Sequence, residues 1–190
     1  MSTPRVLAFA GSIRKDSYNK RLAKIALHAA EKSGAETTFI DLHDFQMPLY
    51  CQDYEKEHGI PDTVVEFKKL LKNHNGFIIA SPEYNSSLTG ILKNTIDWST
   101  RSFEGEDWNS CWNGKIAGIL CAASGQGGRN GLYHLRTILS TYGTIVLPKH
   151  VIVGNCNSNI QNDEVISDEQ LQKQVVDLAN EMLRVVHCLH

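Results

Sequence analysis

Short apolar runs alternate with longer amphipathic segments along this chain, and that alternation limits the possible folds more than any other feature of the sequence. Strand-like runs lie at residues 6–10, 37–41, 76–80, 115–122 and 144–153, the last interrupted by Pro148. Unbroken apolar runs of this kind are typical of strands buried on both faces of a parallel sheet. Because helical segments separate the runs, the order predicts an α/β sandwich with a parallel sheet and right-handed crossovers.

Five segments carry apolar residues at the spacing of one helix face. The positions that define them are Leu22, Ile25 and Ala29; Val64, Phe67 and Leu71; Leu88, Ile91, Leu92 and Ile96; Leu132, Leu135 and Leu139; and Leu171, Val175, Leu178 and Met182. Capping-box spacing predicts helix starts at residues 63–66 and 167–170, and Gly143 suits the end of the fourth helix. Residues 42–61 are only weakly periodic and contain Pro48 and Gly59, so we expect a long surface excursion there. We expect a loop over 102–113.

The size and composition fit one domain over residues 1–190. A chain of 190 residues buries roughly 70% of its unfolded surface in a single core. The formal net charge of −2 provides no basic field, so we expect neither nucleic acid nor an anionic membrane as a partner. The apolar run 6–10 is too short for a signal-peptide core or a membrane span. We therefore expect a cytoplasmic protein.

Cysteine and histidine spacing excludes several kinds of site. The five cysteines are odd in number and contain no Cys-x-x-Cys pair, so we expect free thiols, with Cys121 in the core. No histidine spacing is typical of metal ligands, and we expect no metal site. Residues 125–131 resemble a dinucleotide fingerprint, but Asn130 stands at the third glycine position. The sequence lacks the P-loop motif, and Ser124 lacks the frame of a nucleophile elbow.

Polar residues follow the first strand and precede the first helix. Ser12, Arg14, Ser17, Tyr18 and Asn19 occupy this loop, which we expect at the carboxyl edge of the sheet, where such folds bind ligands. Hydroxyl groups, free amides at a helix start and an arginine are the donors that a phosphate dianion requires. The alternative is that Ser17 is only an N-cap and Arg14 a solvated charge.

Two further loops reach the same predicted edge. Pro82, Glu83, Tyr84 and Asn85 follow the third strand, and their flat ring, carboxylate and amide suit a planar heterocycle with donors and acceptors along one rim. The alternative is a surface turn. The loop 124–128 after the fourth strand has little side-chain bulk, so its backbone amides can approach a ligand closely; a merely flexible turn is the alternative there.

Taken together, these motifs resemble the NADPH-dependent FMN reductases, a flavodoxin-like group that includes quinone, chromate and azo-dye reductases. The resemblance rests on the motifs at 11–19, 82–86, 90–101, 114–115, 124–128 and 133–136. It implies a three-layer sandwich with a five-stranded parallel sheet in the order 2-1-3-4-5, a non-covalent FMN, and a homodimer or homotetramer. It further implies that Ser12, Arg14, Ser17 and Asn19 hold the FMN phosphate, that Pro82, Glu83, Tyr84 and Asn85 line the flavin ring, and that Ser124 and its neighbours contact the other side of the cofactor site. Tyr18, Ser86 and Gly125 complete the implied cofactor-binding set.

The implied activity is transfer of hydride from NADPH or NADH through FMN to a small-molecule acceptor such as a quinone, an azo compound, a metal oxyanion or free flavin. The cofactor carries this chemistry, so we assign no catalytic side chain. Two alternatives remain at this point. One is a reductase that releases FMN as a substrate, and the other is an electron carrier or flavin-binding module without NAD(P)H activity.

Overall fold

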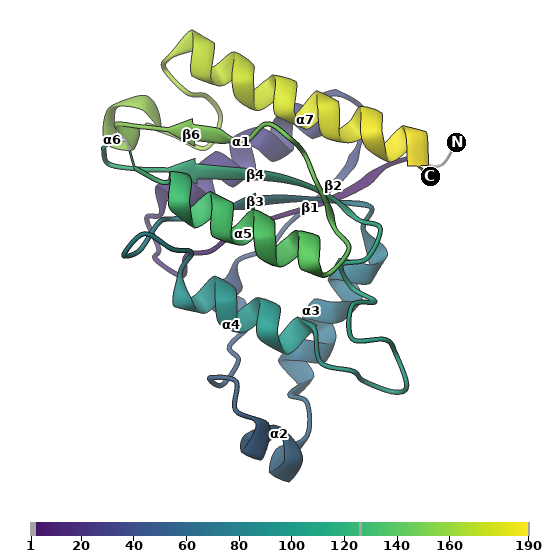
Figure 1. The fold of residues 1–190 in the computed structure, drawn as a ribbon. Helices are drawn as coiled ribbons and strands as arrows, with labels where there is room; N and C mark the ends of the chain where they lie inside the picture. The colour runs from purple at the N-terminus through teal and green to yellow at the C-terminus, as the bar shows by residue number, and fades with distance from the viewer. Residues whose placement is uncertain (1–2, 126, 190) are drawn as a thin grey trace.

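All strands of the central sheet run parallel to their neighbours in the computed structural model, which describes residues 3–125 and 127–189. The strands are β1 (Arg5–Ala10), β2 (Glu36–Phe39), β3 (Gly76–Ala80), β4 (Ile116–Ala122), β5 (Ile145–Val146) and β6 (Val151–Val153). Their order is β2-β1-β3-β4-β5, and β6 pairs with the end of β4 (Figure 1). The predicted parallel sheet and its order 2-1-3-4-5 are confirmed.

The apolar runs form the centre of the sheet. Every residue of β3 and β4 is buried, as is all of β1 after Arg5. Continuous register joins β1 to β3 and β3 to β4, from Val6 opposite Gly76 to Ala80 opposite Leu120. These strands are covered on both faces, which explains why they lack the alternating pattern of a half-exposed strand.

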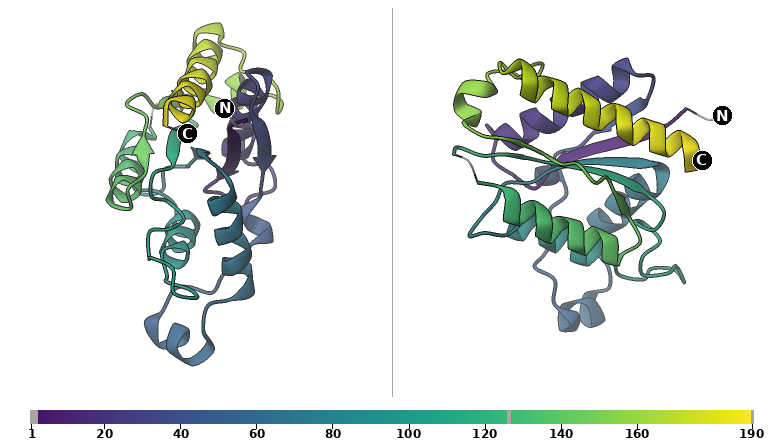
Figure 2. Two further views of the ribbon diagram at one scale, coloured as in Figure 1. Left: turned by 90° about the vertical axis from the view of Figure 1, so that its right-hand side faces the viewer. Right: turned by 45° about the horizontal axis from the view of Figure 1, so that its top comes forward.

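Helices cover the two faces of the sheet and create two separate cores (Figures 1 and 2). One face carries α1 (Tyr18–Lys32) and the long C-terminal helix α7 (Glu169–Leu189). The other carries α3 (Asp62–Asn73), α4 (Gly90–Ser99) and α5 (Arg129–Thr141). This arrangement is the predicted three-layer sandwich.

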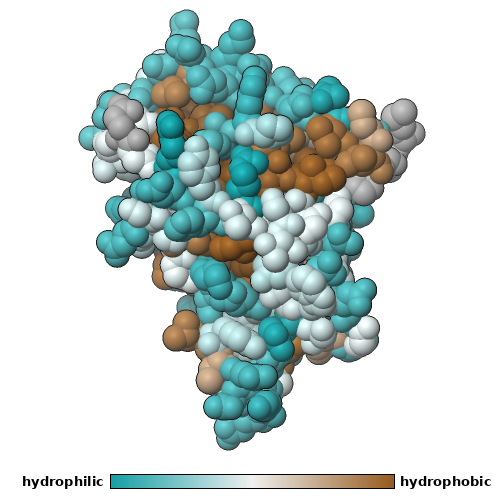
Figure 3. Space-filling model, in the orientation of Figure 1, coloured by the Kyte–Doolittle hydropathy of each residue, from teal (hydrophilic) through white to brown (hydrophobic). Residues whose placement is uncertain are grey.

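The segment 42–61 contains helical structure that the sequence analysis did not predict. It includes the short 3-10 helix η1 (Leu42–Asp44) and the helix α2 (Gln52–His58). No residue of α2 is buried, and Figure 1 shows it projecting from the body at the bottom of the view. The space-filling view in Figure 3 shows that this projection is mainly hydrophilic, whereas apolar side chains reach the surface along α7. An exposed helix has no apolar stripe, which is why periodicity missed it.

Two helix starts differ from the prediction. The helix α3 begins at Asp62 without a side-chain cap, because its N-cap residue is Pro61; Thr63 lies inside the first turn, and its hydroxyl donates to the Gln46 carbonyl at 3.0 Å. At the start of α7, Asp168 rather than Ser167 is the cap, since its Oδ1 accepts from two backbone amides at 2.9 Å. The capping-box interpretation is therefore wrong for Thr63 and one residue early for α7.

The predicted fifth strand is split into β5 and β6 around Pro148. Both pieces pair with β4, and Arg136 on α5 donates to the carbonyls of Val146 and Pro148 at 3.2 Å each. A short helix, α6 (Cys156–Asn159), then follows β6. In the described ranges 3–125 and 127–189, no helix combines the length and apolar character needed to cross a membrane.

Candidate functional site

Loops after β1, β3, β4 and β6 meet at the carboxyl edge of the sheet around a cavity of about 420 Å³. Its volume lies within the range of small-molecule pockets. The lining residues are Ser12, Arg14, Ser17, Tyr18, Asn19, Pro82, Glu83, Tyr84, Ala122, Ala123, Ser124, Gly125, Gly127, Gly128, Cys156 and Asn157. Ten of the twelve residues predicted from the sequence line it; Asn85 and Ser86 do not.

The loop after β1 presents donors at the start of α1. Ser17 is the N-cap of this helix, and its Oγ accepts from the Lys20 amide at 3.4 Å. Ser12 is buried at 4% exposure, and its hydroxyl accepts from the amide of Arg14 at 3.4 Å. The first amides of a 15-residue helix carry a partial positive charge toward the cavity, so this end suits an anionic group.

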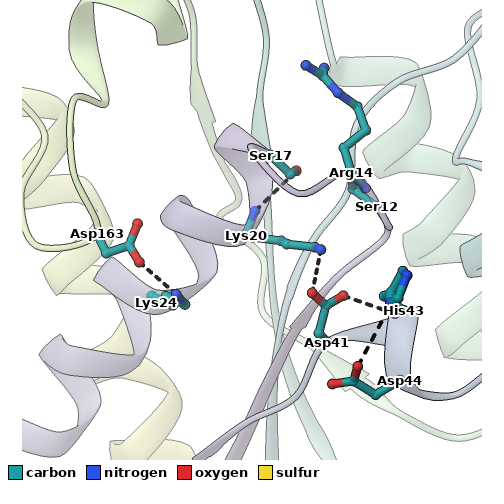
Figure 4. A network of polar contacts seen from close by, with 9 residues as sticks. All are labelled: Ser12, Arg14, Ser17, Lys20, Lys24, Asp41, His43, Asp44 and Asp163. Carbon is teal, nitrogen blue, oxygen red and sulfur yellow. Dashed lines mark hydrogen bonds and ion pairs between the residues drawn. The ribbon is translucent and has the colours of Figure 1, made fainter.

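Neighbouring lysines on α1 are neutralised by acids, as Figure 4 shows. Lys20 pairs with Asp41, and Lys24 pairs with Asp163 at 2.6 Å. Arg14 points away from both pairs, and no hydrogen bond or ion pair engages its guanidinium among the residues that the structure describes. Arg14 is the only cation in the described lining of the cavity, so it is available to an anionic ligand.

Asn19 joins α1 to the end of β4. Its Nδ2 donates to the Ala122 carbonyl and its Oδ1 accepts from the Ala122 amide, both at 2.9 Å. The side chain is buried at 4% exposure. Asn19 therefore lines the cavity, but its amide group is already used in holding two of the loops together.

The loop after β3 forms a tight turn. Tyr84 and Ser87 exchange backbone hydrogen bonds at 2.9 and 3.1 Å, and the two residues between them, Asn85 and Ser86, have φ values of +50° and +63°. Positive φ at both central positions is the pattern of a type I′ turn. Tyr84 is half-exposed and faces the cavity, whereas Asn85 and Ser86 lie at the exposed tip of the turn.

Side chains fasten this turn to both neighbouring loops. Thr89 Oγ1 donates to the Gly11 carbonyl after β1 at 2.7 Å. On the other side, Glu83 Oε2 accepts from the amide of Gly131 on α5 at 2.8 Å. A third bond joins Ser87 Oγ to His134 Nδ1 at 3.0 Å. The walls of the cavity are thus connected to one another.

The loop after β4 depends on a glycine at 128. Gly128 has a φ of +111°, and a Cβ at this position would lie 2.5 Å from the Cys121 sulfur. Burial raises the pKa of the Cys121 thiol to about 12, and the nearby Glu83 carboxylate adds to the rise. Cys121 is therefore an inert core residue, as predicted, and Gly128 brings the backbone close to it.

Sequence reasoning missed the fourth wall of the cavity, formed by Cys156 and Asn157. Burial raises the pKa of the Cys156 thiol, although backbone amides and the nearby Arg14 act in the opposite direction. The polar run 154–159 follows a strand at the same sheet edge as the other three loops. Because this run follows the fifth predicted strand, its position could have indicated that it lies at the same edge as the other loops.

The helix α4 positions the projecting segment rather than a ligand. Asn94 Nδ2 and Trp98 Nε1 both donate to the Pro48 carbonyl, at 2.9 and 2.7 Å. Arg101, just after the helix, pairs with Glu55 on α2 at 2.8 Å. These motif residues are therefore occupied in holding α2 against the body of the protein.

A larger cavity of about 890 Å³ lies elsewhere, between α7 and the segment joining β5 to β6. Its floor includes Leu147, Val151 and Leu178, and Glu181 and Arg184 at its rim pair with each other at 2.7 Å. It lies away from the loops that follow β1, β3 and β4, and the motif residues singled out from the sequence do not line it. The smaller cavity is therefore the candidate site.

Comparisons with known proteins agree with the fold and the motifs. A family model described as NADPH-dependent FMN reductase matches residues 4–158. A probable NADPH:quinone oxidoreductase 2 from Oryza sativa subsp. japonica is 36% identical over 136 residues, covering 70% of this chain and 63% of that protein. This chain therefore spans less than two thirds of the rice protein's length. The quinone reductase of Escherichia coli (strain K12) is 33% identical over 171 residues, covering 88% and 87% of the two chains.

Solved structures show the same architecture. The flavoenzyme NAD(P)H:(acceptor) oxidoreductase FerB from Paracoccus denitrificans superimposes with a TM-score of 0.81 and 26% identity, covering 98% of this chain and 99% of FerB. A flavodoxin from the domain Archaea, at 10% identity, shares the fold with a TM-score of 0.66, covering 96% and 99%. The fold is flavodoxin-like, and the chain belongs to the family of NADPH-dependent FMN reductases.

Proposed function

We propose that this single-domain protein binds FMN in the edge cavity and transfers hydride from NADPH or NADH to a small-molecule acceptor. The observation that carries the proposal is the convergence of the β1, β3 and β4 loops on one cavity, with Arg14, which has no partner among the described residues, in the loop that leads into α1. The sequence motifs of the family lie in these same loops. The quinone reductase names of the relatives favour a quinone as acceptor; azo compounds, metal oxyanions and free flavin are further candidates.

The donors on the β1 side suit the FMN phosphate. Arg14 would bind the phosphate through its guanidinium, and the first amides of α1 and the Ser12 and Ser17 hydroxyls would supply further hydrogen bonds. Asn19 contributes by fixing α1 against β4. A phosphate bound here would pair with Arg14, which has no partner among residues 3–125 and 127–189, and would lie near the positive end of α1.

The β3 and β4 loops suit the flavin ring. Pro82 and Tyr84 offer flat apolar surface, and the low bulk of Ser124 and Gly125 leaves backbone amides accessible. Bound FMN supplies the redox chemistry, accepting hydride and passing electrons on. The chain's own contribution is to hold the ring, to exclude water from one side, and to direct amide donors toward the rim where negative charge develops.

The family resemblance leads us to propose a cytoplasmic homodimer or homotetramer. The size of the purified protein, measured by light scattering with and without FMN, tests the assembly. A monomer at all concentrations would contradict this part of the proposal without affecting the cofactor assignment.

Flavin binding and turnover test the function together. We expect the purified protein to show a flavin spectrum, or to acquire one on addition of FMN, and to retain FMN through gel filtration. NADPH or NADH should then bleach the flavin anaerobically, and menadione should restore its colour. Failure to acquire the spectrum would refute the proposal. Loss of FMN on the column would indicate a reductase that releases it, and binding without bleaching would indicate an electron carrier.

A further inference from the structure

The helix α5 has no cap of its own. Its N-cap residue is Gly128, which has no side chain to accept from the first amides. Glu83 takes this role instead, with its Oε2 accepting at 2.8 Å from the amide of Gly131, which lies 48 residues later in the chain. An acidic side chain near the N-terminus of a helix is stabilised by the helix dipole and by the free amides.

This cap belongs to the wall of the candidate cavity. Glu83 lines it and is the only anion among its described lining residues. A Cβ on Gly127 would lie 3.8 Å from Glu83 Oε1, so the carboxylate reaches the glycine loop after β4. Its charge already influences the Cys121 thiol, whose pKa rises through burial and then through Glu83. The carboxylate thus connects the β3 loop to α5 and places a negative charge beside the cavity.

The packing around the cap is close. A Cβ added at Gly131 would lie 3.1 Å from the Ser87 carbonyl oxygen and 3.4 Å from the Glu83 Cβ. The turn of the β3 loop therefore rests directly on the first turn of α5. The Glu83 side chain therefore contributes both to the spacing of these two walls, through its hydrogen bond, and to the electrostatic field between them, through its charge.

We propose that Glu83 is a positioning residue that holds the β3 loop on α5 and lowers the reduction potential of the bound flavin. The inference rests on the proposed FMN site. Reduction adds negative charge to the flavin, and a carboxylate lining the same cavity disfavours that charge. The partial positive charge at the N-terminus of α5 would stabilise the negative charge of the reduced flavin, but the Glu83 carboxylate offsets that partial charge. Removing the charge while keeping the hydrogen bond therefore raises the potential.

Two substitutions separate position from charge. Glu83→Gln keeps an oxygen acceptor for the Gly131 amide but loses the charge, whereas Glu83→Ala loses both. We expect Glu83→Gln to bind oxidised FMN about as tightly as the wild-type protein does. We expect it to bind reduced FMN roughly tenfold more tightly than the wild-type protein, which raises the midpoint potential by about 30 mV for a two-electron couple. We expect Glu83→Ala to weaken binding of oxidised FMN roughly tenfold, because the cap is lost. Glu66→Gln, at an exposed site on α3, is the matched control.

Midpoint potentials from dye-coupled reduction and FMN titrations measure these effects. Exchange of the Gly131 amide hydrogen in the FMN-free protein tests the cap independently, and it should accelerate in Glu83→Ala but not in Glu83→Gln. An unchanged potential in Glu83→Gln, or unchanged Gly131 exchange in Glu83→Ala, overturns the inference. If wild type binds no FMN, the proposed function fails together with the role in the potential, while Gly131 exchange still decides the positioning role.

Discussion

The side-chain amide of Asn19 forms a pair of hydrogen bonds with the backbone of Ala122, 103 positions further along the chain. One bond is donated and one is accepted, each at 2.9 Å, so both polar ends of the amide are satisfied. Because the pair links the start of α1 to the end of β4, it sets the position of the loop between β1 and α1 relative to the sheet. Asn19 was predicted as a direct phosphate ligand, and that role remains a prediction.

Replacing Asn19 should therefore destabilise the fold. Asn19→Ala leaves a buried carbonyl and amide of Ala122 without partners, and we expect the free energy of unfolding to fall by about 2–4 kcal/mol. Asn19→Asp should cost more, because a carboxylate cannot donate to the carbonyl and is itself buried. Urea denaturation measures the change, with exposed Asn130→Ala as the control. Wild-type stability in Asn19→Ala would contradict the role described.

Arg14 should discriminate FMN from riboflavin. Removing a charge-assisted contact costs about 1.5–3 kcal/mol, so Arg14→Ala should weaken FMN binding by about 10- to 150-fold. Riboflavin lacks the phosphate, and its affinity should change little. Quenching of flavin fluorescence measures both constants, and Lys15→Ala, in the same loop, is the control. Equal losses for the two flavins would place the phosphate elsewhere.

Tyr84 and Asn85 should behave differently, although the sequence analysis grouped them. Tyr84→Ala removes a ring from the cavity wall, and we expect FMN affinity to fall roughly tenfold on the scale of aromatic stacking. Asn85→Gly keeps the positive φ of the turn tip and should leave affinity near the wild-type value. The same fluorescence titration measures both. A larger loss for Asn85→Gly than for Tyr84→Ala would show that the turn tip moves onto the flavin.

Gly128 should tolerate no side chain. Gly128→Ala combines an unfavourable φ with a contact against the Cys121 sulfur, and we expect a loss of about 2–4 kcal/mol in unfolding free energy. Adding Cys121→Ala should recover part of this loss by relieving the contact but not the backbone strain. Gly90→Ala, where a Cβ meets nothing within 4 Å, should be neutral or slightly stabilising. Thermal and urea unfolding of the three variants measures the order of their stabilities. Equal stability of Gly128→Ala and Gly90→Ala would refute the requirement for glycine at position 128.

His74 should make stability depend on pH. Burial lowers the pKa of this residue, whose Nδ1 is hydrogen-bonded to the Leu70 carbonyl at 2.6 Å. The unfolded chain, with a histidine pKa of about 6.5, then binds the proton more readily than the folded protein. The stability from neutral His74 is therefore fully present above about pH 6.5 and is lost as pH falls toward the folded pKa.

Urea unfolding at pH values above and below this range tests the effect. His74→Gln should show a shallower loss of stability on acidification than wild type, whereas His28→Gln, exposed on α1, should show the wild-type slope. An unaltered slope in His74→Gln would assign the pH dependence to other groups.

The elements that the sequence predicted well are those whose signal is local. The runs that became β1, β3 and β4 are buried on both faces, so their composition alone identifies them. The helix α2 was missed because none of its residues is buried; tertiary contacts from α4, not periodicity, hold it. Pro148 was recognised as an interruption, but the hydrogen bonds of Arg136 on α5 to the carbonyls of Val146 and Pro148 could not be read from the sequence.

The site residues that directly follow the ends of strands could be predicted from the sequence. The contacts between residues far apart in the chain could not. Ser12, Arg14 and Tyr84 lie in loops that the topology rule places at one edge. The cap between Glu83 and Gly131 was not predictable, because nothing local in either segment indicates the other. Cys156 and Asn157 were missed because the loop after the last strand was not considered.

The hydrogen bonds of Thr89 and Glu83 to the two neighbouring loops also have a kinetic consequence. Walls that are already connected need no closing motion before a ligand binds, so encounter rather than rearrangement should set the rate of flavin association. The guanidinium of Arg14, which has no partner in the described part of the chain, would then attract the phosphate of the proposed FMN from solution over about one Debye length. The association rate constant should fall as ionic strength rises, while dissociation, governed by contacts already shielded inside the cavity, should respond much less.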